Sequence, residues 1–254
     1  MDKILNSIKN NWYDYKEKHD IYWDDPEFII KVFKINPNFL LASIGLRNNK
    51  KIVLEAVKID GFYLHHASEK LKNDKEFVLE AVKINGKSLK FASKTLQKDK
   101  DVVLEAVKNN GLVLSYASKE LQNNKEIVIE AVKNNPQALF LGSINFTNDK
   151  DVILEAIKIN GYYLGYASEE LRGNKELVLK AIKSYGYALN CASKNLRNDK
   201  KLIMIAFKKL NYIDCSKFKM CNNQFKEYSV NNIFTKSYNQ ILSIECFERT
   251  LRIF

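Results

Sequence analysis

Proline and glycine are scarce in this sequence, with 3 and 9 residues respectively among 254. So few turn-forming residues leave little material for β-turns or flexible linkers, and we therefore expect a mostly helical chain. Long apolar runs are also missing, because the longest ones, such as residues 202–207, fall far short of the ~20 residues that cross a bilayer. We expect no transmembrane helix and no membrane partner. The first residues, MDKILN, lack the features of a secretory signal, so we expect an intracellular, cytoplasmic protein.

Cysteine is also sparse, and its positions exclude two kinds of site. The four cysteines, Cys191, Cys215, Cys221 and Cys246, all fall in the last quarter of the chain. This is no disulfide framework for a core of this size, so we interpret them as reduced thiols. The spacing of Cys215 and Cys221, with no histidine after His66, does not close a tetrahedral zinc site. We expect no metal and no other cofactor.

The dominant feature of the sequence is internal repetition with a period of 25 residues. A leucine column that begins at Leu64 and a serine column that begins at Ser68 both keep this period. An alanine, followed by an apolar residue and a lysine, marks it at Ala56, Ala81, Ala106, Ala131, Ala156, Ala181 and Ala206. Such self-similarity is typical of repeat proteins, in which each repeat buries its apolar face against its neighbours.

Each repeat carries its own helix signals. Side chains suited to N-caps precede the alanine stretch, at Asn49, Asp74, Asp99, Asn124, Asp149, Asn174 and Asp199. A helix of about three turns is expected from there, and Gly61 and its equivalents should end it as residues that tolerate a positive φ. Leu64, Ala67 and Leu71, at spacings of three and four, predict a shorter second helix.

These signals predict an all-α fold, namely an α-solenoid of tandem 25-residue helix-turn-helix repeats with helical N- and C-terminal caps. We place the N-terminal capping helix at residues 1–25, seven to eight repeats at 26–210 and the C-terminal cap at 211–254. The first cap is predicted from a helical apolar stripe that begins with Ile4 and Ile8. The second is predicted because apolar residues continue after the repeat frame is lost.

The stretch LEAVKINGKSLKFASKTLQKDK and its relatives LEAVKNNGLVLSYASKELQNNK and LEAIKINGYYLGYASEELRGNK resemble the repeats of the domain-of-unknown-function family numbered 4116. The resemblance covers about residues 27–210. It implies a helical repeat protein of the kind common in giant double-stranded DNA viruses of amoebae, with no catalytic motif. On that basis we expect a viral protein, located in the host cell or the virion.

No residue pattern in the chain predicts an enzyme. A glutamate column, which begins at Glu55, stands three residues before the lysine column, and this spacing favours ion pairs on a solvated helix face. Adjacent residues of a helix point about 100° apart, so we do not expect His65 and His66 to hold one metal ion together. Nucleotide-binding glycine loops and hydrolase motifs are missing from the sequence. We expect neither catalysis nor a small-molecule substrate.

Nucleic-acid binding is one functional alternative, because the net charge is +11. A lysine row that repeats every 25 residues could follow a phosphate backbone, through Lys75, Lys100, Lys125 and Lys150. An acidic residue follows most members of this row, however. A second lysine row, which begins at Lys58, has the glutamate column beside it. We therefore rank nucleic-acid binding second, behind the interpretation that these lysines form solvated ion pairs.

Protein binding is the hypothesis that we favour. One column varies in chemistry from repeat to repeat, through His65, Lys90, Ser115, Phe140, Gly165 and Asn190, so we expect it to be exposed. The next column stays mostly bulky and should be packed or half-packed. Tyr63, Tyr116, Tyr163 and Tyr166 lie nearby as candidate anchors, since tyrosine is favoured at interaction hot spots, although core packing also explains such rings. The expected partner is an unidentified protein or a second copy of this chain.

Overall fold

The computed structural model of the chain describes residues 26–35, 44–142 and 144–210. The predicted caps at 1–25 and 211–254 lie outside these residues. The chain divides into two compact units, Met1–Ile144 and Asn145–Phe254, and each is described by itself. The described residues are helical without any β-strand, so the predicted all-α repeat solenoid is confirmed. No helix within these ranges combines the length and the apolar character that a membrane span requires.

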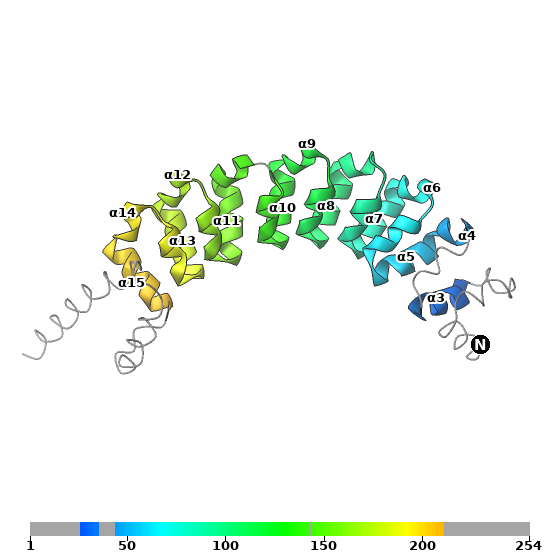
Figure 1. The fold of residues 1–254 in the computed structure, drawn as a ribbon, viewed down its shortest axis with the longest axis horizontal. Helices are drawn as coiled ribbons and strands as arrows, with labels where there is room; N and C mark the ends of the chain where they lie inside the picture. The colour runs from blue at the N-terminus through cyan, green and yellow to red at the C-terminus, as the bar shows by residue number, and fades with distance from the viewer. Residues whose placement is uncertain (1–25, 36–43, 143, 211–254) are drawn as a thin grey trace, which may run out of the picture. The chain divides into compact units, whose positions relative to one another are not determined.

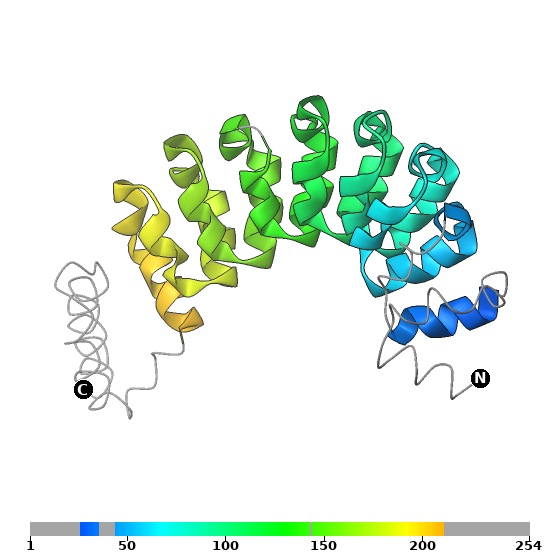
Figure 2. The same cartoon turned by 45° about the vertical axis from the view of Figure 1, so that its right-hand side comes forward.

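Each repeat begins with a ten-residue α-helix. In the first unit these long helices are α3 (Pro26–Ile35), α5 (Lys50–Ile59), α7 (Lys75–Ile84), α8 (Lys100–Asn109) and α10 (Lys125–Asn134). In the second unit they are α11 (Lys150–Ile159), α13 (Lys175–Ser184) and α15 (Lys200–Lys209). Within each unit the long helices of consecutive repeats stand side by side (Figure 1, Figure 2).

The predicted N-caps are confirmed for α5, α7, α8, α10, α11, α13 and α15. The Asn49 Oδ1 accepts a hydrogen bond of 3.2 Å from the Ile52 backbone N–H. The Asp99 Oδ1 accepts two bonds, from the N–H groups of Asp101 at 3.0 Å and Val102 at 3.2 Å. Each such cap satisfies donors that the helix itself cannot, which stabilises it by about 1 kcal/mol.

The second element of the repeat differs from the prediction, because it is a 3-10 helix followed by a separate short helix. The 3-10 helices that follow the long helices are η3 (Gly61–His66), η4 (Gly86–Phe91), η6 (Gly111–Tyr116) and η7 (Pro136–Phe140) in the first unit, and η9 (Gly161–Tyr166) and η10 (Gly186–Cys191) in the second. The short helices are α4 (Ile44–Arg47), α6 (Glu69–Lys72), η5 (Leu96–Lys98), α9 (Lys119–Gln122), η8 (Ile144–Asn148), α12 (Glu169–Arg172) and α14 (Lys194–Arg197).

Leu64, Ala67 and Leu71 therefore do not share one helix, and a bond between repeats explains the break. Ala67 leaves the helix with φ −61° and ψ 157°. The next residue, Ser68, donates its N–H to the Arg47 carbonyl of the preceding repeat at 2.8 Å. The Ser68 hydroxyl then caps the short helix α6 by accepting from the Leu71 N–H at 3.3 Å.

The glycine column has a different role from the predicted one. Gly61, Gly86, Gly111, Gly161 and Gly186 do not adopt a positive φ. A Cβ at Gly86 would lie 2.6 Å from the Ala106 carbonyl oxygen of the next repeat, too close for any side chain. Glycine is thus needed because the next long helix approaches the backbone at this point.

The core runs between the long helices and the 3-10 helices. Val53, Ala56 and Leu64 are fully buried, as are the equivalent residues of the other described repeats. Within the first unit η3 contacts η4, η4 contacts η6 and η4 also contacts α8, so each 3-10 helix packs against the following repeat. Each repeat therefore depends on its neighbour to bury its apolar face.

Candidate functional site

The 3-10 helices present a regular outer surface, because a helix with 3.0 residues per turn has three straight rows of side chains. In η3, Gly61 and Leu64 are buried, Phe62 and His65 are exposed, and the remaining two residues are half-buried. The column predicted to be exposed is exposed throughout, at His65, Lys90, Ser115, Phe140, Gly165 and Asn190. We call this row, together with the column three residues before it, the variable face.

Aromatic rings and one lysine form a continuous group on and beside the variable face of the first unit. The Phe62 ring lies 5.6 Å from the Phe91 ring in an edge-to-face arrangement, and the His65 ring lies 5.4 Å from Phe91. The Lys90 Nζ lies over three rings, at 5.1 Å from Phe62, 5.3 Å from Phe91 and 5.7 Å from Tyr116. These cation–π contacts bridge neighbouring repeats, and the sequence alone did not predict them.

The two adjacent histidines lie together without forming a metal site. The ring centroids of His65 and His66 are 4.5 Å apart, and their planes are inclined by 52°. Burial, followed by the positive charge of neighbouring groups, lowers the pKa of His66. In the part of the chain that the structure describes, no group of three or more His, Cys, Asp or Glu side chains could hold a metal ion.

A tyrosine cluster occupies the same position in the second unit. The Tyr166 hydroxyl donates to the Tyr162 hydroxyl at 3.3 Å, and the Tyr163 ring lies 5.9 Å from the Tyr166 ring. The hydrogen bond with Tyr162, together with desolvation, raises the pKa of Tyr166. Tyr166 is 39% exposed, although it belongs to the column directly after the variable one, which was predicted to be packed or half-packed.

The four predicted anchors are therefore not equivalent. Tyr63 and Tyr163 are half-buried, as is Tyr116 below Lys90, so each offers only part of its ring to a partner. Burial, followed by the charge of Asp60, raises the pKa of the Tyr63 hydroxyl. The best exposed rings are Phe140 at 53% and Tyr162 at 49%.

The lysine row proposed for phosphate contacts forms ion pairs between repeats. Its members bind acidic residues at or just after the N-cap of the next long helix, as in Lys50–Asp74 at 2.7 Å, Lys75–Asp99 and Lys75–Asp101 at 2.8 Å, Lys100–Glu126 at 2.6 Å and Lys150–Glu176 at 3.1 Å. The sequence predicted neutralisation by nearby acids, but it did not show that the partner belongs to the neighbouring repeat.

The second lysine row forms the predicted pairs with the glutamate three residues earlier, as in Lys58–Glu55 at 2.5 Å and Lys108–Glu105 at 2.8 Å. Such exposed pairs contribute little stability, so we call this column of solvated ion pairs the lysine ladder.

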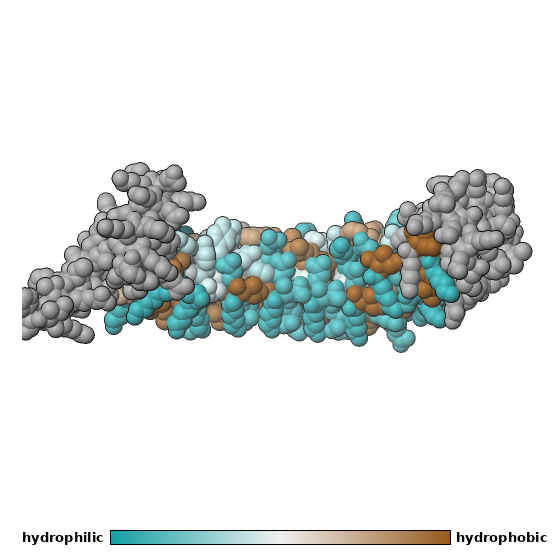
Figure 3. Space-filling view, turned by 90° about the horizontal axis from the view of Figure 1, so that it is seen from below, coloured by the Kyte–Doolittle hydropathy of each residue, from teal (hydrophilic) through white to brown (hydrophobic). Residues whose placement is uncertain are grey.

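Seen from below, the surface of the described residues is largely hydrophilic with small, separate hydrophobic patches (Figure 3).

A comparison with protein families shows which family the chain belongs to. The model of a family described as a domain of unknown function (DUF4116) matches residues 49–97, 99–146, 124–172, 149–197 and 174–218. The chain belongs to the DUF4116 family. No curated protein and no solved structure matches it. The resemblance found in the repeat sequence is thereby confirmed, and each family match spans about two of the 25-residue DUF4116 repeats.

Two DUF4116 repeats also contain a buried glutamine that the sequence analysis missed. The Gln97 Nε2 donates to the Lys90 carbonyl at 2.9 Å and to the Ala92 carbonyl at 3.2 Å. The Gln122 Nε2 donates to the Ala117 carbonyl at 2.9 Å. These bonds fix the end of each 3-10 helix to the following short helix. The sequence did contain a signal for these glutamines. They stand at a repeat position that is polar within an otherwise apolar pattern, and other repeats have the basic residues Arg47 and Arg172 at that position.

Proposed function

We propose that this DUF4116 protein is a non-catalytic scaffold that binds a protein partner through its variable face. One observation carries the proposal: the row from His65 to Asn190, in which neighbouring repeats differ in chemistry, is exposed in each 3-10 helix that follows a long helix. Buried columns such as Ala56 and Leu64 stay nearly constant over the same repeats. Variation along an exposed row is expected where repeats recognise different parts of a partner.

The chemistry of the variable face also supports a protein ligand. Exposed rings such as Phe62, Phe140 and Tyr162 offer apolar area at a low cost in side-chain entropy, and aromatic residues dominate interaction hot spots. They are separated along the repeats, so the binding energy should be spread over several small contacts. A viral origin, with a location in the host cytoplasm or the virion, is part of this proposal and rests on the repeat resemblance described above.

Site-specific photo-crosslinking in an extract of the native cell tests the proposal. Phe140 and, in a separate protein, Tyr162 are replaced by benzoylphenylalanine, and Lys108 and Lys158 on the lysine ladder serve as control positions. We expect positions 140 and 162 to crosslink to the same protein and the two control positions to give no such product. If the product is a second copy of this chain, the partner is the protein itself. Crosslinks from the control positions alone would refute the assignment of the binding face.

Nucleic-acid binding is the second candidate, favoured by the net charge of +11. Lys75, Lys100 and Lys150 would have to give up the ion pairs described above before they contact phosphates, and Lys125 stands at the equivalent position. If the four lysines bind phosphates, their joint replacement by Gln should flatten the salt dependence of affinity by about 0.9 logarithmic units each. The absence of binding to DNA or RNA at about 50 mM salt would refute this candidate.

A further inference from the structure

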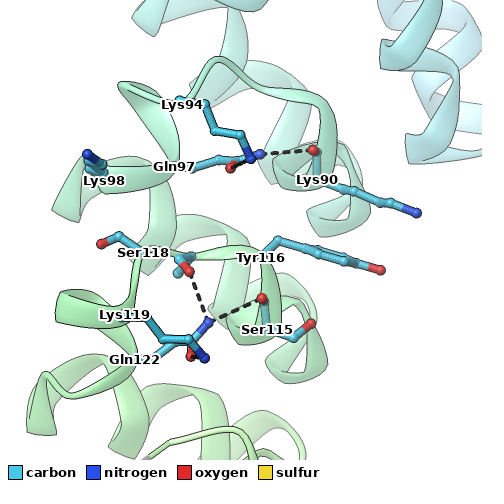
Figure 4. Close-up of a pocket in the computed structure, with 10 residues that line it drawn as sticks. Lys90, Lys94, Gln97, Lys98, Ser115, Tyr116, Ser118, Lys119 and Gln122 are labelled. Atoms are coloured by element: carbon cyan, nitrogen blue, oxygen red, sulfur yellow. Dashed lines mark hydrogen bonds between the residues drawn. The ribbon is translucent and has the colours of Figure 1, made fainter.

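Four lysines from two neighbouring repeats surround one pocket in the first unit (Figure 4). The pocket has a volume of about 540 Å³ and is bordered by η4, η5, η6 and α9. Its lysines are Lys90, Lys94, Lys98 and Lys119. Ser115, which is also on the variable face, lines it as well, and no lining residue is acidic. We call this site the lysine pocket.

Two of the four ammonium groups are held in place by neutral partners. The Lys94 Nζ donates to the Gln97 Oε1 at 3.0 Å, and the Lys119 Nζ donates to the Gln122 Oε1 at 3.0 Å. Each glutamine is itself fixed by backbone carbonyl groups through its Nε2. A neutral amide orients a lysine without cancelling its charge, so the lysine pocket keeps a preorganised positive potential.

The lysine pocket differs in this respect from the lysine rows around it. Among the described residues, none of its four lysines forms a salt bridge. Nearby, Lys75 is paired with two aspartates and Lys100 with Glu126. Glu120 follows Lys119 in the sequence but is exposed and does not line the pocket. The four lysines of the pocket lie in two neighbouring repeats, and no acidic side chain lines the pocket with them.

This charge is not a general property of the repeat. At the position of Lys94, other repeats have Glu69, Glu169 and Lys194, and at the position of Lys90 they have His65, Phe140 and Asn190. At the position of Lys98, the preceding repeat has Asn73. The full set of four lysines is thus found in one pair of the described repeats, because Lys90 and Lys98 have no lysine equivalent in the others, whereas the ion-paired rows recur from repeat to repeat.

We propose that the protein partner carries an acidic segment whose carboxylates dock in the lysine pocket. This inference rests on the proposed function and names the chemistry of the partner at one place on the variable face. Charge complementarity supports an acidic ligand. This set of four lysines occurs at one place and does not form a continuous row, which favours a short peptide segment over a nucleic acid, because a phosphate backbone gains affinity from many contacts along its length.

The test measures fluorescence anisotropy of labelled hexaglutamate with the full chain at low salt. We expect binding with a Kd below about 1 mM, and none for labelled hexaglutamine. The double variant Lys94→Gln/Lys98→Gln should weaken hexaglutamate binding by about five- to tenfold. The control Lys108→Gln/Lys133→Gln removes the same charge from the ladder and should change binding by less than about twofold. Circular dichroism establishes that both variants remain folded.

Two results would overturn the inference. In one, both double variants weaken hexaglutamate binding equally, which would mean that only the net charge matters. In the other, labelled hexathymidylate binds more tightly than hexaglutamate and loses its affinity in the Lys94→Gln/Lys98→Gln variant, which would assign the lysine pocket to nucleic acid. Either result leaves the photo-crosslinking from Phe140 and Tyr162 intact, so failure of this inference is distinguishable from failure of the proposed function.

Discussion

The sharpest test of the packing between repeats uses two glycines of the same 3-10 helix, η9. A Cβ added at Gly161 would lie 2.8 Å from the Ala181 carbonyl carbon and closer still to its oxygen. These are backbone atoms, so the next long helix, α13, must move. A Cβ at Gly165, which is exposed, meets only the Cys191 side chain, with the Sγ at 3.2 Å and the Cβ at 3.8 Å, so a small shift of that side chain accommodates it. The two substitutions add the same methyl group in opposite environments.

We expect Gly161→Ala to lower the free energy of unfolding by about 1–3 kcal/mol through overpacking. Gly165→Ala should be neutral or should stabilise the protein by up to about 1 kcal/mol, because alanine restricts the unfolded chain. Thermal unfolding followed by circular dichroism measures the difference, since each kcal/mol shifts the Tm by about 2–4 °C in a protein of this size. Equal Tm values for the two variants would refute the close approach of the repeats at Gly161.

Three further predictions concern the core and the caps. Ala106 is fully buried between repeats, so Ala106→Trp should cost about 1–3 kcal/mol or more, and an unchanged Tm would contradict the assigned buried face. The hydrogen bond from Lys50, followed by that from the Phe77 backbone, lowers the pKa of Asp74. The ionised Asp74 carboxylate therefore stabilises the fold above the unfolded-state pKa of about 3.9, and this stabilisation is lost as the pH falls through the folded-state pKa. Unfolding titrations should show a weaker acid dependence for Asp74→Asn, and an unaltered profile would argue against this linkage. Gln97→Ala leaves buried carbonyls without their donor, so it should cost about 1–3 kcal/mol in urea unfolding, whereas a loss below 0.5 kcal/mol would indicate that water replaces the amide.

The sequence predicted those features of the fold that depend on residue type at a fixed period. N-caps such as Asp99 are confirmed, because an N-cap is a local interaction between a side chain and the backbone two or three residues later. The exposed column of Phe140 is confirmed for a related reason: repeats that share a structure vary only where packing permits.

Features that depend on contacts between repeats could not be predicted. The period shows which residues are equivalent, but it does not show which atoms of the next repeat they meet. The break at Ala67, the need for glycine at Gly86 and the pairing of Lys100 with Glu126 all follow from such contacts. The lysine pocket was missed for the same reason, since Lys94 and Lys119 come together only when the two repeats are stacked.

The central claim is that a protein partner binds the variable face. The most direct test is isothermal titration calorimetry, which measures the affinity of the purified partner, identified by crosslinking, for three forms of the protein. The wild type is compared with Phe140→Ala/Tyr162→Ala, which removes the two most exposed aromatic rings of the described residues, and with Lys108→Gln/Lys133→Gln. We predict that each ring contributes about 1–2 kcal/mol, so the first variant should bind at least about thirtyfold more weakly, while the ladder variant should bind like the wild type. Loss of binding in the ladder variant with retention in the ring variant would show that the lysine ladder, and not the variable face, recognises the partner.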